Sequence, residues 1–155
     1  MKPKDERRAL KNLYDLIDRM PKFECIPGCT DCCGPVPASR EEIRKASKLA
    51  NVPERLETLV ETDTLGWCAT CDYARPGHGC AIYEDRPFLC RLFGYSEAPQ
   101  LTCVHGRGST KKLTIQQTAA LTDRYVKIIN AVPERKAAQE KINAIRKEKW
   151  RTDHL

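Results

Sequence analysis

The sequence predicts a mainly α-helical protein whose helices pack around an irregular, cysteine-rich loop core that binds metal. Apolar residues recur at helical spacing towards both ends of the chain, and nine cysteines with many prolines and glycines lie between those segments. At 155 residues a single domain is expected. Its predicted parts are an N-terminal helix in 1–22, the cysteine-rich core in 23–108 with helices inserted at 39–62, and C-terminal helices in 114–150.

The first helix is expected over residues 4–20. Leu10, Leu13, Ile17 and Met20 recur at the spacing of one helix face, and Pro21 marks the end. A structural role, in which the helix packs on the core, is favoured over any binding role.

Two further helices are expected inside the cysteine-rich core. Ser39-Arg-Glu-Glu42 has the form of a capping box, and apolar Ile43, Ala46 and Leu49 follow it. Asn51 is suited to the C-terminal cap. Pro53 fits the first turn of a second short helix.

The second irregular zone runs from 66 to 108. Cys80-Ala-Ile-Tyr83 is expected to form a short strand or a turn, and Pro87 occupies a typical first position of a helix. After it, Thr114-Ile-Gln-Gln117 is a second capping box, and Leu121, Tyr125 and Ile128 form an apolar stripe on the helix that it opens.

The cysteines are interpreted as metal ligands. Their number is odd, and the charged N-terminal residues lack the apolar core of a secretory signal, so a reducing cytoplasm is expected. Cys29-x-x-Cys32 and Cys68-x-x-Cys71 have the spacing that turns two sulfurs towards one ion. Soft thiolates select zinc, copper(I) or iron–sulfur clusters. All nine are candidate ligands: Cys25, Cys29, Cys32, Cys33, Cys68, Cys71, Cys80, Cys90 and Cys103.

The adjacent pair Cys32-Cys33 argues against one plain zinc finger. Neighbouring side chains tend to point apart, so the two sulfurs either serve two centres, or one is a ligand and the other a packing or reactive thiol. Of the histidines, His78 and His105 each lie two residues from a cysteine, but both are expected to be ordinary loop residues.

The formal net charge of +6 is weak support for nucleic-acid binding. Thiolates held by metal bring negative charge that the count omits, so part of the basic excess balances the sulfur centre. The basic segment 135–151 is compatible with a nucleic-acid contact, but a solvated helical face is favoured. No stretch is long and apolar enough for a membrane helix, so no association with a membrane is expected.

The residues resemble those of the CxxCxxCC family, also described as a putative zinc- or iron-chelating domain or a predicted iron–sulfur-cluster protein family. The resemblance covers about residues 23–108. It rests on the cysteines of 25–33, on Gly79-Cys80-Ala-Ile-Tyr83-Glu-Asp-Arg86-Pro87-Phe-Leu-Cys90-Arg91, and on Cys103-x-x-Gly106. The first gap has three residues where the family signature has two.

The resemblance implies a ligand set that includes every cysteine except Cys71, which falls outside the pattern and is counted on its spacing alone. An iron–sulfur cluster is slightly favoured over zinc, with Arg86 and Arg91 beside the ligands to balance the charge. In the block Tyr83, Asp85 and Arg86, a turn held by an arginine–carboxylate pair is favoured over a contact with substrate.

The leading hypothesis is a cytoplasmic metal-binding protein with a redox, metal-handling or enzyme-accessory role and an unidentified protein partner. A metal-dependent enzyme, either an oxidoreductase or one that modifies peptides or proteins, is one alternative. A zinc-stabilised module that binds nucleic acid or protein is the other. The sequence singles out no catalytic residue.

Overall fold

A computed structural model describes residues 1–33, 36–52 and 71–131 of the chain. Cys68, the second inserted helix and the basic segment 135–151 lie outside these ranges. In the described part the protein is mainly helical, as predicted, with one two-stranded sheet. Within the same ranges, no helix has both the length and the apolar character needed to cross a membrane.

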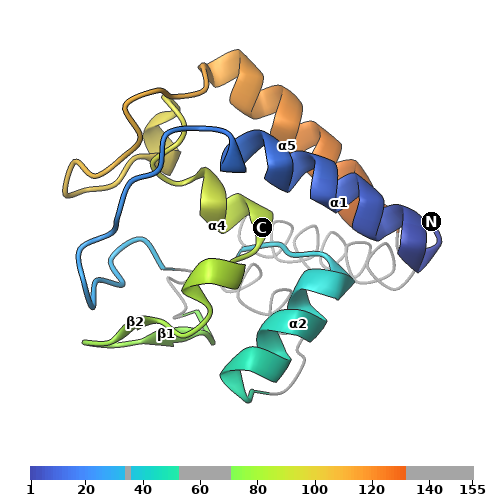
Figure 1. Cartoon of the computed structure of the whole chain (residues 1–155), viewed down its shortest axis with the longest axis horizontal. Helices are drawn as coiled ribbons and strands as arrows, with labels where there is room; N and C mark the ends of the chain where they lie inside the picture. The colour runs from blue at the N-terminus through green and yellow to red at the C-terminus, as the bar shows by residue number, and fades with distance from the viewer. Residues whose placement is uncertain (34–35, 53–70, 132–155) are drawn as a thin grey trace, which may run out of the picture.

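Three helices build the core. α1 (Pro3–Asp18) lies beside α5 (Ile115–Asn130), and the short α4 (Phe88–Leu92) packs against both (Figure 1). The buried cluster confirms the predicted apolar faces of α1 and α5 and adds α4 and Tyr95 to them. Its members are Leu10, Leu13, Ile17, Phe88, Leu92, Tyr95, Leu121, Tyr125, Ile128 and Ile129. Burial of such a contiguous apolar surface is the main stabilising contribution to this end of the molecule.

Both predicted capping boxes are present. Ser39 caps α2 (Arg40–Ala50), and Thr114 caps α5. Asn51 ends α2 in the left-handed conformation, with φ of 53°. Ile43 and Ala46 are buried as expected, whereas Leu49, in the last turn of α2, is exposed.

The carboxyl group of Glu42 ties α2 to the rest of the core. It accepts hydrogen bonds from the backbone N–H groups of Ser39 and Phe88, both at 2.8 Å, and from the hydroxyls of Tyr14 and Tyr125. These four donors come from α1, α5 and the starts of α2 and α4. Glu42 therefore fixes the beginning of α4, the helix that carries Cys90.

The other side of the molecule is built from loops. A small antiparallel hairpin joins β1 (Ala74–Arg75) to β2 (Gly79–Cys80), and two short 3-10 turns follow at Tyr83–Asp85 and Pro99–Leu101. The long connection after α1 runs past α4 towards this hairpin (Figure 1). Helices thus form one side of the fold, and the cysteine-bearing loops gather on the other.

Candidate metal centre

The first cysteine loop packs directly against the turn of the hairpin. Gly28 has a φ of +76°, and a Cβ atom built on it would lie 2.7 Å from the backbone oxygen of Gly77. Only glycine permits both this conformation and this approach. The backbone N–H groups of Cys29 and Cys33 donate to the carbonyls of Ile26 and Thr30, and these hydrogen bonds close two successive tight turns. The loop is thereby held against the hairpin.

Four cysteines from four segments meet in one pocket, called here the sulfur pocket. Cys33 comes from the first loop, Cys71 precedes β1, Cys80 lies on β2 and Cys90 lies on α4. Cys32 borders the pocket as well. Its other walls are mostly apolar, and they include Val36, Ile82, Pro87 and Phe93. An apolar shell around clustered thiols limits access of water to anything bound there.

Burial and the neighbouring thiols raise the pKa of three cysteines in the sulfur pocket, Cys33, Cys71 and Cys90. Burial, followed by the neighbouring thiols of Cys32, Cys80 and Cys71, raises the pKa of Cys33 to about 12. The pKa of Cys90 is also raised, mainly by burial and by Cys71. Several thiolates can therefore coexist in the pocket near neutral pH only if a cation lies among them. This donor set fits a metal centre.

Arg86 supplies a fixed positive charge at the sulfur pocket. It lines the pocket, and its charge partly opposes the rise in the pKa of Cys33 and Cys90. Its guanidinium lies over the ring of Tyr83 at 4.0 Å, and its Nε donates to the Tyr83 carbonyl at 2.9 Å. A cation held in this way can offset the net negative charge of a metal centre made from four thiolates.

Arg91 lies elsewhere. Its guanidinium is over the ring of Tyr14 at 4.6 Å and donates to the carboxylate of Asp18 at 3.2 Å, and it does not line the pocket. The structure thus brings Arg86, but not Arg91, to the cysteines. In the expected arginine–carboxylate turn, the partners also differ: Asp85 pairs with Lys45 of α2, while Arg86 stacks on Tyr83.

The remaining described cysteines form a second set, called here the outer group: Cys25, Cys29, Cys32 and Cys103. After burial, the influences that raise the pKa of Cys32 come from Cys25, Cys103 and Cys29. For Cys33, the thiols that raise the pKa are Cys32 itself and then Cys80 and Cys71 of the sulfur pocket. The two adjacent cysteines thus have different further thiol neighbours, and Cys32 also lines the sulfur pocket. That the pair serves two centres stays a prediction.

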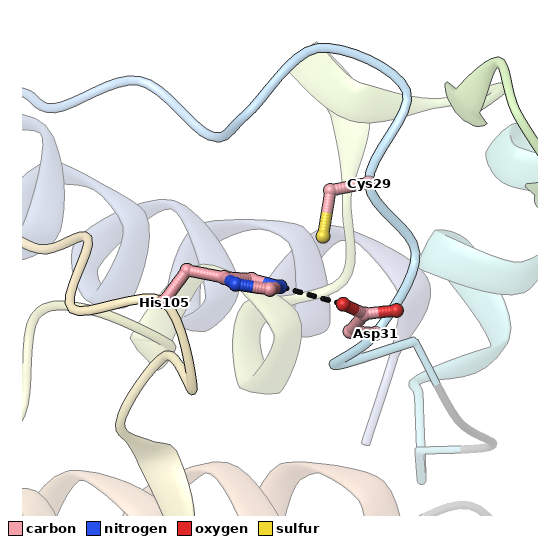
Figure 2. A group of neighbouring side chains, drawn as sticks. All are labelled: Cys29, Asp31 and His105. Atoms are coloured by element: carbon pink, nitrogen blue, oxygen red, sulfur yellow. Dashed lines mark hydrogen bonds and ion pairs between the residues drawn. The ribbon is translucent and has the colours of Figure 1, made fainter.

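The outer group adjoins an aspartate and a histidine. Nε2 of His105 and Oδ2 of Asp31 are 2.5 Å apart, although 74 positions separate the two residues in the chain. The thiol of Cys29 points towards the space between them (Figure 2), and one ligand atom from each residue lies within 4.8 Å of the other two. In the described part of the chain, no other set of three or more such ligand atoms is this compact.

Sequence reasoning did not find this grouping. Asp31 was not singled out, and His105 was expected to be an ordinary loop residue; its place two residues after Cys103 was the available signal. His78 is exposed in the turn of the hairpin, outside the compact set. Of the nine predicted ligands, eight fall in the two groups and Cys68 lies outside the described residues. Their role as ligands stays a prediction.

Comparison with known proteins agrees with the ligand chemistry. No curated protein and no solved structure matches the chain. The model of one family, CxxCxxCC, described as "Putative zinc- or iron-chelating domain", matches residues 24–118. That match spans both groups of cysteines, Arg86 and the start of α5, and it covers more than half of the chain. The protein belongs to the CxxCxxCC family, whose description names the chelation of zinc or iron.

Proposed function

We propose that the sulfur pocket holds an iron–sulfur cluster and that the protein serves a redox or metal-handling role in the cytoplasm. The observation that carries the proposal is the convergence of Cys33, Cys71, Cys80 and Cys90 on one apolar pocket that also contains a fixed arginine. Four cysteine thiolates are the usual ligands of such clusters, and hydrogen bonds and charges near the sulfurs tune their reduction potential.

A multinuclear centre does not need the close sulfur spacing that a single ion needs. A tetrahedral zinc site with Zn–S bonds of about 2.3 Å holds its sulfurs about 3.8 Å apart. Among the described residues, no three cysteine sulfurs lie within 4.8 Å of one another. A cluster in which each iron binds its own cysteine does not require so compact a set of sulfurs.

Zinc is the second candidate, and the spacing of Cys29-x-x-Cys32 favours it. A zinc centre would be structural and would stabilise the loop side of the fold, where few apolar residues are buried. The two candidates predict different compositions, so one preparation can separate them.

The test is anaerobic purification of the full chain, followed by determination of iron, acid-labile sulfide and zinc and by a visible absorption spectrum. The proposal predicts brown protein with roughly equal amounts of iron and sulfide and broad visible absorption that is lost in air. Colourless protein that contains zinc and no sulfide would establish the second candidate. Metal-free protein with freely titrating thiols contradicts both.

A further inference from the structure

One member of the outer group, Cys29, lies beside an aspartate and a histidine, and the proposed cluster uses none of the three. Cys29, Asp31 and His105 offer a thiol, a carboxylate and an imidazole, and one ligand atom of each lies within 4.8 Å of the other two. These atoms come from two loops that are far apart in sequence. The fold must therefore position both loops before the three side chains can meet.

Each loop is held in a turn. The first loop turns at Ile26–Cys29 and again at Thr30–Cys33, so that Cys29 and Asp31 lie on successive turns. The second loop is closed by a hydrogen bond from the N–H of Gly106 to the carbonyl of Cys103 at 3.0 Å. In that turn, the N–H of His105 approaches the sulfur of Cys103 at 3.4 Å, and the imidazole extends towards Asp31 (Figure 2).

We propose that Cys29, Asp31 and His105 form a second metal site, which takes a single divalent ion of the borderline class, such as Zn²⁺, Fe²⁺ or Co²⁺. Sulfur, nitrogen and oxygen donors together suit these ions, whereas a purely sulfur set suits clusters or copper(I). The site does not depend on what the sulfur pocket contains.

The site is open to solvent. The side chain of Asp31 is 59% exposed and that of His105 is 39% exposed. Three protein ligands with one accessible position are typical of zinc and iron sites that bind water or an exogenous ligand. The ion would replace the direct contact between His105 and Asp31, because all three donor atoms would turn to the metal. The resulting site is exchangeable, in contrast to an enclosed cluster.

The chain offers matched control positions. Asp72 is an exposed aspartate next to a cysteine, as Asp31 is, and His78 is an exposed loop histidine two residues from a cysteine, as His105 is. Neither control residue belongs to the compact set. Asp31→Asn and His105→Ala can therefore be compared with Asp72→Asn and His78→Ala.

The experiment titrates reduced, metal-free, full-length protein with Co²⁺, whose visible bands report tetrahedral coordination. Equilibrium dialysis counts the ions bound. We expect His105→Ala to bind one ion fewer per chain than the wild type, and Asp31→Asn to bind that ion at least about 10-fold more weakly. Both controls should match the wild type. In NMR spectra of the cobalt-loaded wild type, the ring signals of His105 should be strongly shifted.

Equal stoichiometry and affinity in His105→Ala and the wild type would overturn the proposal, because the four thiols of the outer group would then bind the ion without His105. An equal loss in His78→Ala would also overturn it, as a sign of non-specific binding. Cys33→Ser separates this inference from the proposed function. That variant should lose binding in the sulfur pocket and keep the ion that depends on His105.

Discussion

The carboxyl group of Glu42 allows a quantitative test of how the helices position the sulfur pocket. Each of its two oxygens accepts one backbone N–H and one tyrosine hydroxyl: Phe88 and Tyr14 donate to Oε1, and Ser39 and Tyr125 donate to Oε2. In Glu42→Gln, an NH₂ group replaces one of the oxygens. That group faces two donors and can satisfy neither.

The two hydroxyls have alternatives, but the backbone groups do not. The hydroxyl of Tyr14 also reaches the carbonyl of Arg86 at 3.2 Å, and that of Tyr125 reaches the carbonyl of Pro37 at 3.3 Å. One buried N–H, of Ser39 or of Phe88, is left without an acceptor at a cost of about 1–3 kcal/mol. Loss of the charge weakens the remaining bonds by about 1 kcal/mol more. The substitution should therefore destabilise the fold by about 2–4 kcal/mol.

The matched control is Glu41→Gln, one residue earlier on α2. Glu41 pairs with Arg44 at the surface, and such pairs contribute about 0.2–1 kcal/mol. Urea unfolding followed by helical circular dichroism, at matched metal content, compares the two variants. With a slope of about 2 kcal/mol/M, Glu42→Gln should lower the midpoint by about 1–2 M. A midpoint for Glu42→Gln within about 0.2 M of the control would refute this reasoning.

Three further predictions concern the loops and the pocket. Gly28→Ala should reduce the metal retained after dialysis, because its Cβ would meet the oxygen of Gly77 at 2.7 Å. Gly106→Ala has a similar φ of +74° but open space around its Cβ, so it should retain more metal than Gly28→Ala. Arg86→Gln should lower the reduction potential of the proposed cluster, measured by redox titration, because a positive charge beside the thiolates is lost; an unchanged potential would show that Arg86 does not act on the centre. In metal-free, reduced protein, the pKa of Cys33 is raised from 9.0 to about 12, so the folded state favours the neutral thiol and should lose stability as the pH rises from about 9 towards 12, as measured by urea unfolding. Constant stability over the accessible part of that range would contradict the assigned burial.

The features that sequence predicted correctly are local ones. The capping boxes at Ser39 and Thr114 depend on residues three positions apart, and both are present. The second role of Glu42 was not predicted, because its other donors come from helices that are distant in the sequence. A capping glutamate followed by a buried face gave no sign that two tyrosines would converge on it.

The division of the cysteines also depends on long-range structure. The pair Cys32-Cys33 indicated that two groups were possible, but their membership follows from where the hairpin and α4 place Cys80 and Cys90. The choice between Arg86 and Arg91 has the same origin, since stacking on Tyr83 holds only Arg86 at the pocket. Spacing along the chain could not distinguish two arginines whose side chains stack on different tyrosines, Tyr83 and Tyr14.

The most direct test of the central claim compares Cys33→Ser with Cys32→Ser, two adjacent cysteines whose other thiol neighbours differ. Iron, zinc and sulfide per chain are measured after anaerobic purification, together with the visible spectrum. The structure predicts that Cys33→Ser loses the centre of the sulfur pocket and its absorption, whereas Cys32→Ser keeps both. Equal loss in the two variants, or full retention in both, would contradict the assignment of Cys33 to a metal centre that Cys32 does not share.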